Sequence, residues 1–367
     1  MEVILKLEKD IINKFLVEGN FIEAQPFGSG KINDTYLIKY KIDQKEKKYI
    51  LRKINRYVFK EPKLMVENTV NVTQHIRKKI NLVANPNPTD KVLTLINSKN
   101  KKFYHLDEND DYWCMIEYIE DAYTIDIVET ETQAFEAAKA FGRFQKYLAD
   151  FNVLNCHITI KNFHNLPNRI NVLKKAINQD ILKRTHSIED LLKNVDNYFY
   201  LADEFENVTR LNLPTRITHN DTKINNVMLD SKTNKGICVV DLDTVMPGIV
   251  LDDFGDMVRT FTSLASEEED YLKVEMRLPI FEAITKGYLS EMNECLTDNE
   301  KDNLVLGAKI IVFEQTVRFL TDYLQGDVYY KTNHTNHNLD RTKNQMALLE
   351  SIKKQENEMK KIVAKYS

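Results

Sequence analysis

Two short segments place acidic and amide side chains at a spacing that suits phosphoryl transfer. The first is His219-Asn-Asp-Thr-Lys-Ile-Asn-Asn226, and the second, beyond a hairpin pattern, is Val239-Val-Asp-Leu-Asp243. Such chemistry needs a carboxylate that orients the attacking hydroxyl and accepts its proton, together with oxygen ligands for a metal ion at the phosphates. Asp221 and Asn226 are five positions apart on one tight loop, so both can face one point, and the hairpin returns Asp241 to their side.

These positions predict a base, a nearby cation and a metal site. We expect Asp221 to be the catalytic base and Lys223 to approach the transferring group, although an exposed lysine without a role explains Lys223 equally well. Asn226 and Asp241 are the expected Mg²⁺ ligands, because oxygen donors on rigid neighbouring elements suit this hard cation. Asp243 points the same way as Asp241 if the strand continues. It is either a second metal contact or a ligand for a substrate hydroxyl.

A literal Asp253-Phe-Gly255 also occurs, in the letters that mark the metal-binding aspartate of protein kinases. Here it follows a Pro247-Gly248 turn and does not end the strand after the loop. The metal role is therefore assigned to Asp241. Asp253 is expected to brace the loop by accepting hydrogen bonds from its backbone, and His219 to hold the same loop without taking part in chemistry.

The preceding part of the chain predicts a nucleotide clamp. Gly28-Ser-Gly30 gives a flexible turn whose backbone N–H groups can approach phosphates, although two glycines at a hairpin need no ligand. On a following strand, successive side chains point to opposite faces of the sheet, so Arg52 and Lys53 lie on different faces. Arg52 is preferred as the cation for the phosphates. Glu67 on the next helix is its expected acidic partner. Backbone groups near Glu117 are expected to bind the adenine edge.

The pattern along the chain predicts two lobes that meet near residue 120. Residues 1–119 read as a nucleotide-binding lobe of strands with one prominent helix, and residues 120–367 as a mostly helical lobe that carries the catalytic loop and the substrate pocket. The expected strands lie at 36–40, 48–54, 92–96 and 112–118, with two more inside 217–245. The expected helices lie at 64–80, 131–151, 187–206, 269–289, 300–325 and 344–365. The fold class is α+β, a bilobal arrangement like that of protein kinases, with ligands expected in the cleft between the lobes.

Composition places the chain among globular proteins. Of its 367 residues, 43% are hydrophobic and 29% charged, and the net charge of −4 gives no field that would attract nucleic acid or a membrane. Four widely spaced cysteines indicate buried thiols in a reducing compartment. The first residues lack the uninterrupted apolar centre of a signal peptide, and no uncharged apolar stretch is long enough to span a bilayer. A cytoplasmic protein is expected, and nothing in the sequence indicates its oligomeric state.

Seven segments occur in an order that is informative as a set. They are Gly28-x-Gly-x-Ile-Asn-Asp-Thr-Tyr36, Leu64-Met-x-Glu-Asn68, Phe163-His-Asn-x-Pro-x-Arg169, His219-x-Asp-Thr-Lys-x-Asn-Asn226, Val240-Asp-Leu-Asp-Thr-Val-Met-Pro247, Asp253-Phe-Gly-Asp-x-Val-Arg259 and Val317-Arg-Phe-Leu-Thr-Asp-Tyr-Leu-x-Gly-Asp327. Together they resemble the N-acetylhexosamine 1-kinases, within the aminoglycoside phosphotransferase and choline kinase superfamily. One departure is Lys31, which stands where the family pattern has His.

The resemblance implies ATP- and Mg²⁺-dependent phosphorylation of the anomeric hydroxyl of N-acetylglucosamine or N-acetylgalactosamine, with Asp221 as the base. It also implies that Asp34, Arg318 and Tyr329 contact the sugar. From the residues alone, Arg318 lies in an apolar helix pattern and needs a partner, which a salt bridge to a neighbouring helix would also supply.

Two other functions are weighed against the sugar kinase. A kinase for choline or an aminoglycoside would need an acidic or aromatic pocket for its cationic acceptor. Arg318 and Lys223 near the site disfavour such a pocket, whereas another sugar would fit the same features. A non-catalytic kinase-like binding protein would typically lack one of Asp221, Asn226 and Asp241, and all three are present.

Overall fold

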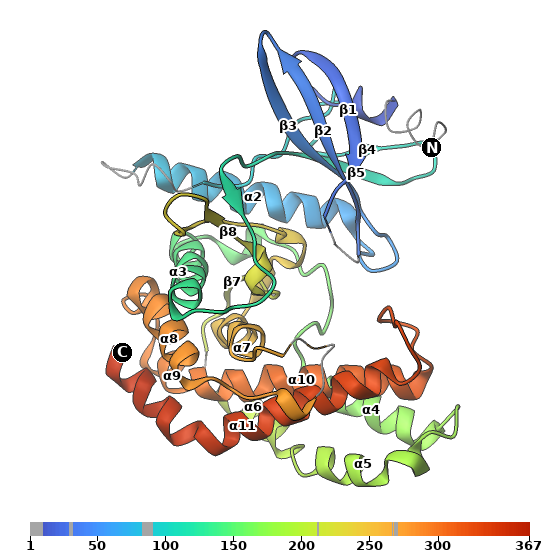
Figure 1. Ribbon diagram of the computed structural model, residues 1–367, viewed down its shortest axis with the longest axis vertical. Helices are drawn as coiled ribbons and strands as arrows, with labels where there is room; N and C mark the ends of the chain where they lie inside the picture. Colours follow the sequence, from blue (N-terminus) through green and yellow to red (C-terminus); the bar gives the residue numbers. More distant parts are fainter. Residues whose placement is uncertain (1–9, 29–31, 83–90, 211–212, 266, 268–270) are drawn as a thin grey trace.

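The upper lobe in Figure 1 is built on a five-stranded antiparallel sheet. The computed structural model describes residues 10–28, 32–82, 91–210, 213–265, 267 and 271–367. The sheet has the order β1-β2-β3-β5-β4. Its strands are β1 (Asn20–Pro26), β2 (Asp34–Ile42), β3 (Lys45–Lys53), β4 (His105–Leu106) and β5 (Tyr112–Glu117).

Strand register decides which side chains of β3 face the rest of the molecule. In the ladders, Arg52 lies opposite Thr35 on one side and Cys114 on the other, whereas its neighbour Lys53 lies opposite Asp34 and Trp113. Directly opposed residues share a face of the sheet. Arg52 therefore points to the face that carries helix α2 (Pro62–Leu82), and Lys53 points away from it.

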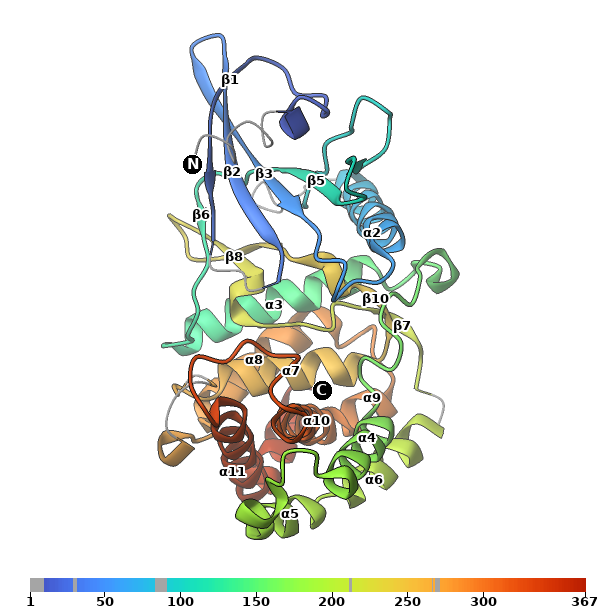
Figure 2. The ribbon, with the colours of Figure 1, turned by 90° about the vertical axis from the view of Figure 1, so that its right-hand side faces the viewer.

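Helix α2 joins the sheet to the lower lobe, as Figure 2 shows. Asn68, which is fully buried, donates from its side-chain amide to the backbone oxygens of His157 at 2.8 Å and Val245 at 2.9 Å, and accepts from the His157 N–H at 2.7 Å. One side chain thus fixes the rotation of α2 against two segments of the lower lobe.

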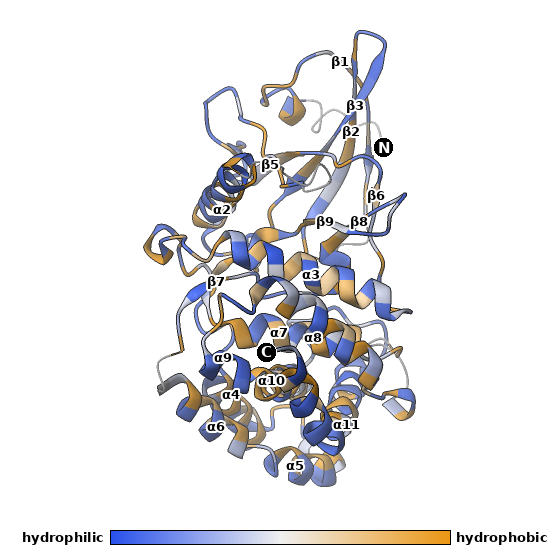
Figure 3. Ribbon diagram, turned by 90° about the vertical axis from the view of Figure 1, so that its left-hand side faces the viewer, coloured by the Kyte–Doolittle hydropathy of each residue, from blue (hydrophilic) through white to orange (hydrophobic). Residues whose placement is uncertain are grey.

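The lower lobe is helical around a single large core. Its helices are α3 (Glu131–Tyr147), α4 (Leu166–Gln179), α5 (Glu189–Asp196), α6 (Tyr200–Arg210), α7 (Val250–Phe261), α8 (Leu278–Met292), α9 (Asp298–Asp302), α10 (Leu304–Gln325) and α11 (His337–Tyr366). In Figure 3, α10 is mostly in the hydrophobic colour and α11 has long hydrophilic stretches. This contrast agrees with the almost continuous burial of α10.

Short strands at the top of this lobe carry the two segments that the sequence predicts to be catalytic. β6 (Ala122–Tyr123), β8 (Val227–Asp230) and β9 (Gly236–Val239) form one antiparallel sheet, and β7 (Arg216–Thr218) pairs with β10 (Met246–Gly248). The β8–β9 hairpin returns the chain from residue 226 to residue 240, where the Val240 N–H donates to the Asn226 backbone oxygen at 2.9 Å. The two catalytic segments are therefore hydrogen-bonded neighbours.

The close approach of α7 to α10 depends on two glycines. A Cβ atom on Gly255 would lie 2.5 Å from the Gly307 carbonyl oxygen, and one on Gly307 would lie 2.6 Å from the Leu251 carbonyl oxygen. Gly255 of the Asp-Phe-Gly sequence therefore serves helix packing. Because α7 begins beneath the catalytic loop, this helix contact also determines where Asp253, in the first turn of α7, lies relative to the loop.

The predicted α+β class is confirmed, with an antiparallel sheet in one lobe and helices in the other. The predicted boundary between residues 119 and 120 falls between β5 and β6 and stays a prediction. The expected strand at 92–96 is wrong, because a single bridge, Leu95 to Ile116, forms there. The reason is that the segment begins on the other lobe, where the Lys91 N–H donates to the Ile237 oxygen.

Three predicted helices have different limits. The helix expected at 187–206 is interrupted at 197–199, and that expected at 300–325 is split at Asn303. Of the helix expected at 269–289, residues 269–270 lie outside the described part of the chain, and α8 begins at Leu278, where Pro279 occupies the first turn and no backbone N–H is needed.

Cys114 and Cys238 are buried in β5 and β9, as expected for thiols in strands, and all four cysteines are free. Among the helices of the described residues, none is long and apolar enough to cross a membrane.

Candidate active site

Residues 219–226, called the catalytic loop after their predicted role, are held from below by the first turns of α7. The Asp253 carboxylate accepts the backbone N–H groups of His219 at 2.8 Å and Asn220 at 2.7 Å, and the side-chain amide of Gln145 at 2.6 Å. Thr222 donates its hydroxyl to the Asp253 backbone oxygen at 2.6 Å. The brace expected of Asp253 is therefore present, and every described contact of its carboxylate is directed to the protein interior.

His219 ties the loop to the returning strand. Its ring is fully buried, with Nε2 2.9 Å from the Val240 carbonyl oxygen and Nδ1 3.3 Å from the Asp221 N–H. Nδ1 accepts from the Asp221 N–H, so Nε2 is the ring nitrogen that donates to Val240. Both contacts are to backbone, so His219 has the holding role that the sequence predicted.

Asp221, Lys223 and Asn226 meet on the loop. The Lys223 ammonium lies 2.9 Å from Asp221 Oδ1, and the Asn226 amide donates to the Asp221 backbone oxygen at 2.8 Å. Burial opposes ionisation of Asp221, but the charge and hydrogen bond of Lys223 hold its pKa below the ordinary value. The carboxylate is therefore charged at neutral pH. Because the amide nitrogen of Asn226 is committed to Asp221, its oxygen is the atom that can serve a cation.

Arg52 of β3 reaches across to the second catalytic segment. Its guanidinium makes a two-pronged contact with Asp243, at 3.1 and 2.5 Å, and lies 3.0 Å from Asp241 Oδ1. Asn33 completes the group by donating to Asp243 Oδ2 at 2.7 Å. Burial of Asp243 raises its pKa even though Arg52 opposes the shift. Asp241 differs, since nearly half of its side chain (47%) is exposed.

This cluster fits the predicted metal ion by the chemistry of its donors. A cation, the Arg52 guanidinium, already lies between the carboxylates of Asp241 and Asp243, and the Asn226 amide oxygen belongs to the neighbouring turn. Oxygen donors of this kind are those that Mg²⁺ prefers. Over the described part of the chain, three or more His, Cys, Asp or Glu side chains do not gather at a metal-binding spacing. The expected ligands are one carboxylate, Asp241, and one amide, Asn226, with Asp243 either a second metal contact or a ligand for a substrate hydroxyl.

The expected pairing of Arg52 with Glu67 is wrong. The Glu67 carboxylate lies 3.7 Å from Lys63, one turn earlier on α2, and 3.5 Å from His157, in the segment that follows α3. The neighbouring Asn68 explains this, because its three hydrogen bonds fix the rotation of α2 and direct Glu67 toward His157. Arg52 takes its acidic partners from the other lobe.

The remaining predictions on the nucleotide side have mixed outcomes. Gly28 adopts φ +78° with open space around it, whereas Gly30 lies outside the described residues. At the end of β5 the Glu117 N–H donates to the Thr94 oxygen and the Tyr118 N–H to the Lys48 oxygen. These two N–H groups are committed to neighbouring segments, and the expectation that backbone groups near Glu117 bind the adenine edge stays a prediction.

A cationic and aromatic group lies on the other side of the catalytic loop. The Arg318 guanidinium of α10 lies over the rings of Phe163 at 5.4 Å and Tyr330 at 5.8 Å, and donates to the Gln315 side chain at 3.2 Å. Burial alone would lower the pKa of Arg318, but Tyr330, Glu314 and Tyr329 raise it. Among the described residues no carboxylate lies within ion-pair distance of Arg318, so the salt bridge left open by the sequence is not formed.

Comparison with known proteins assigns the chain to a family. Residues 23–281, most of the chain, match the model described as the phosphotransferase enzyme family. The chain belongs to this family. Three solved structures share the fold of this phosphotransferase at low sequence identity, and each is covered almost completely.

The first is a microcompartment-associated aminopropanol kinase, with 13% identity over 96% of this chain and 98% of that one, and a TM-score of 0.59. The second is spectinomycin phosphotransferase in complex with ADP and spectinomycin, with 12% identity, coverage of 100% and 98%, and a TM-score of 0.54. The third is choline kinase from Cryptosporidium parvum Iowa II, with 14% identity, coverage of 97% and 96%, and a TM-score of 0.53.

The register of the sheet places Asp34 away from the Arg52 cluster. Asp34 lies opposite Lys53, on the face turned away from Arg52. Its neighbour Asn33 is the residue that reaches Asp243, and Asn33 also accepts the Asn55 N–H at 2.8 Å. The residue before Asp34 is thus the one that contacts the Asp241–Asp243 segment, and the sugar contact expected of Asp34 stays a prediction.

Sequence reasoning also missed the residues behind Arg318. His164 links Glu314 of α10 to the Asn220 backbone oxygen of the catalytic loop, and Arg169 of α4 donates to the Phe163 backbone oxygen. His164 and Arg169 belong to the segment Phe163-His-Asn-x-Pro-x-Arg169, which the sequence analysis included in the family resemblance without giving either residue a role. Their place in that segment was the available signal. Tyr329, predicted as a sugar ligand, is half exposed (52%) and its ring lies 4.8 Å from that of Tyr330.

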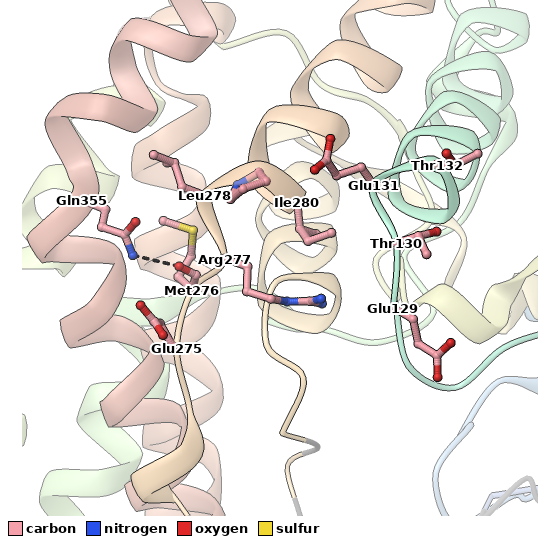
Figure 4. A pocket seen from close by; sticks show the side chains of 11 residues that line it. Glu129, Thr130, Glu131, Thr132, Glu275, Met276, Arg277, Leu278, Ile280 and Gln355 are labelled. Atoms are coloured by element: carbon pink, nitrogen blue, oxygen red, sulfur yellow. Dashed lines mark hydrogen bonds between the residues drawn. The ribbon is translucent and has the colours of Figure 1, made fainter.

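A cavity of about 770 Å³ lies elsewhere on the phosphotransferase (Figure 4), between the starts of α3 and α8 and the middle of α11. Its Arg277 guanidinium is committed to the backbone oxygens of Val128, Phe261 and Thr262. None of the predicted site residues lines this cavity. The cavity is therefore separate from the predicted site between the lobes.

Proposed function

We propose that this phosphotransferase transfers the γ-phosphoryl group of ATP to the anomeric hydroxyl of an N-acetylhexosamine. The observation that carries the proposal is the meeting of a charged, reachable carboxylate, Asp221, and the Asn226 amide with a second segment whose Asp241 and Asp243 carboxylates already hold the Arg52 guanidinium. Phosphoryl transfer needs a base and cation-binding oxygens side by side.

Each residue has a stated task in this reaction. Asp221, with 26% of its side chain exposed, accepts the hydrogen bond and then the proton of the acceptor hydroxyl. Lys223 keeps Asp221 ionised and supplies positive charge beside the reacting oxygens. Mg²⁺, held by Asp241, Asn226 and in one arrangement Asp243, would neutralise phosphate charge when bound. Arg52 supplies a fixed cation on the nucleotide side.

The choice of a sugar acceptor rests on Arg318 and on the resemblance of seven ordered segments to N-acetylhexosamine 1-kinases. A sugar presents hydroxyls and an amide carbonyl but no charge. A guanidinium supported by Phe163 and Tyr330 offers several donors in a fixed plane for such groups.

The solved relatives make an amine-bearing acceptor the natural competitor. An aminopropanol kinase and a choline kinase share this fold, and both are named for small amino alcohols. In the present chain the region around Arg318, here called the acceptor side, carries two guanidinium groups, Arg169 and Arg318, and the Glu314 carboxylate there is engaged by His164. This balance of charge disfavours a cationic acceptor.

Release of ADP from ATP and Mg²⁺ tests the proposal across a panel of N-acetylglucosamine, N-acetylgalactosamine, their parent hexoses, choline, ethanolamine and an aminoglycoside. We expect turnover with the N-acetylhexosamines above all others. Asp221→Asn serves as the blank for contaminating kinases. Preferred turnover of choline or the aminoglycoside would contradict the sugar assignment while retaining the phosphotransferase.

A further inference from the structure

His164 lies in the segment before α4 and bridges two parts of the site that are far apart in sequence. Its Nε2 is 3.1 Å from the backbone oxygen of Asn220, and its Nδ1 is 3.1 Å from Glu314 Oε1 on α10. The side chain of His164 is 9% exposed and that of Glu314 is 2% exposed. The bridge is therefore shielded from water at both ends.

The chemistry of the two partners sets the state of the ring. A peptide carbonyl and an ionised carboxylate can only accept, so both ring nitrogens must donate, which requires the imidazolium form. Burial would lower the pKa of His164, but the charge and hydrogen bond of Glu314 outweigh it, with help from Asp252, and raise the pKa to about 9. Geometry and electrostatics agree on a charged bridge.

Asn220 is the residue through which the bridge reaches the base. It adopts φ +64°, which costs free energy for a residue with a side chain. Its N–H is held by Asp253 at 2.7 Å, its side-chain amide donates to the Thr244 oxygen at 2.9 Å, and its carbonyl is held by His164. That carbonyl belongs to the peptide group joining Asn220 to Asp221, so His164 fixes the orientation from which the Asp221 side chain projects.

The other end of the bridge reaches the acceptor side. Glu314 lies one helical turn before Arg318 on α10, and the Phe163 ring, adjacent to His164 in the chain, lies under the Arg318 guanidinium. Arg169 also donates to the Phe163 backbone oxygen at 3.0 Å. Two consecutive residues, Phe163 and His164, thus contact the acceptor side and the catalytic loop.

We propose that His164 is a positioning residue that couples the acceptor side, through Glu314, to the orientation of the catalytic base Asp221. The inference rests on the proposed function only in taking Asp221 as the base. It does not depend on which hydroxyl compound is the acceptor. It predicts that the catalytic loop loosens when the bridge is cut, even with no acceptor present.

The test compares three variants by two readouts. His164→Gln keeps one donor, Glu314→Gln removes the charge of the partner, and Glu356→Gln is the control. Glu356 is on α11, and both of its carboxylate oxygens lie 3.1 Å from the ammonium of Lys309, which is on α10 like Glu314. Its substitution therefore weakens an ion pair to α10 away from the catalytic loop. The first readout is amide hydrogen exchange over residues 217–226 in the nucleotide-free protein. The second is kcat and both KM values with the best acceptor of the panel.

We expect faster exchange over 217–226 in His164→Gln and Glu314→Gln, and wild-type exchange there in the control. We expect kcat to fall about 10- to 100-fold in both variants, because small displacements of a catalytic group cost that much. KM for ATP should stay within about twofold. The double variant should be no worse than either single one, since both cut the same bridge.

Wild-type exchange over 217–226 together with wild-type kcat in His164→Gln would overturn the proposal, even if thermal stability falls. Exchange needs no acceptor, so failure of the sugar hypothesis leaves this test intact. Loss of sugar turnover in the wild-type protein itself would refute the proposed function and not the bridge. If His164→Gln does not fold, Glu314→Gln provides both readouts alone.

Discussion

Asp241 and Asp253 offer the clearest separation of a metal ligand from a structural brace. Asp253 is 1% exposed and accepts two backbone N–H groups of the catalytic loop, whereas nearly half of the Asp241 side chain faces solvent. Replacing each with alanine should therefore produce opposite patterns of stability and metal response.

The magnitudes follow from the contacts. Asp253→Ala leaves three buried donors without an acceptor, the N–H groups of His219 and Asn220 and the Gln145 amide, at about 1–3 kcal/mol each, so the free energy of unfolding should fall by about 3–9 kcal/mol. Asp241→Ala removes an exposed contact to Arg52, which keeps its bonds to Asp243, and should cost less than about 1 kcal/mol. Its activity should vanish or require far more Mg²⁺.

The assay pairs urea denaturation with Mg²⁺ titration of ADP release. Asp253→Asn retains one acceptor oxygen and serves if Asp253→Ala does not fold. The reasoning is refuted if Asp253→Ala keeps wild-type stability while its Mg²⁺ requirement rises, or if Asp241→Ala is the destabilised variant with an unchanged Mg²⁺ response.

Three further predictions concern the base, the acceptor side and the buried bridge. Asp221→Asn should reduce kcat by about 10²–10⁴-fold with unchanged thermal stability, and near-normal kcat would remove Asp221 as the base. Arg318→Lys should lower kcat/KM for the acceptor about 10- to 100-fold, because the planar fork is lost, while KM for ATP stays constant; an equal change in both KM values would argue against an acceptor role. Since the pKa of His164 is raised from 6.5 to about 9, its ion pair should contribute fully below pH 6.5 and be lost as pH rises through 9. The difference in unfolding free energy between wild type and His164→Gln should shrink over that range by on the order of 3 kcal/mol, measured by urea denaturation at pH 6.5 and 9.5, and a constant difference would show that the ring is neutral.

The catalytic loop could be predicted because its signal is local. Asp221 and Asn226 are only five residues apart and belong to one short loop, and a single short hairpin returns the chain to Asp241. Few backbone conformations can satisfy this spacing, so the three residues are forced close together. Asp253 could be separated from the metal site by its position after the Pro247-Gly248 turn. These inferences needed only the order and spacing of neighbouring residues.

Contacts between distant segments could not be predicted in the same way. Asn33 and Asp243 are 210 positions apart, and His164 and Glu314 are 150 apart. Glu67 was assigned to Arg52 because the helix follows the strand, but the rotation of α2 depends on Asn68 and its partners in the other lobe. Periodicity identifies that a helix exists, whereas its rotation is decided by tertiary contacts.

The breaks in the helical lobe have the same origin. The predicted helices at 187–206 and 300–325 are continuous by apolar spacing, yet the chain interrupts them at 197–199 and at Asn303. Helix propensity differs little among ordinary residues, so packing decides where a long pattern is divided. By contrast, the start of α8 at Leu278 was signalled by Pro279 in the sequence.

Phosphorylation of a free N-acetylhexosamine beside its 1-O-methyl glycoside, in the presence of ATP and Mg²⁺, tests the central claim most directly. The glycoside keeps the other hydroxyls and the amide for Arg318 but blocks the oxygen that Asp221 is proposed to activate. The account predicts ADP release and a sugar 1-phosphate, identified by phosphorus NMR, from the free sugar alone. Equal phosphorylation of both compounds would place the phosphate elsewhere on the ring, and turnover of neither would contradict the sugar assignment.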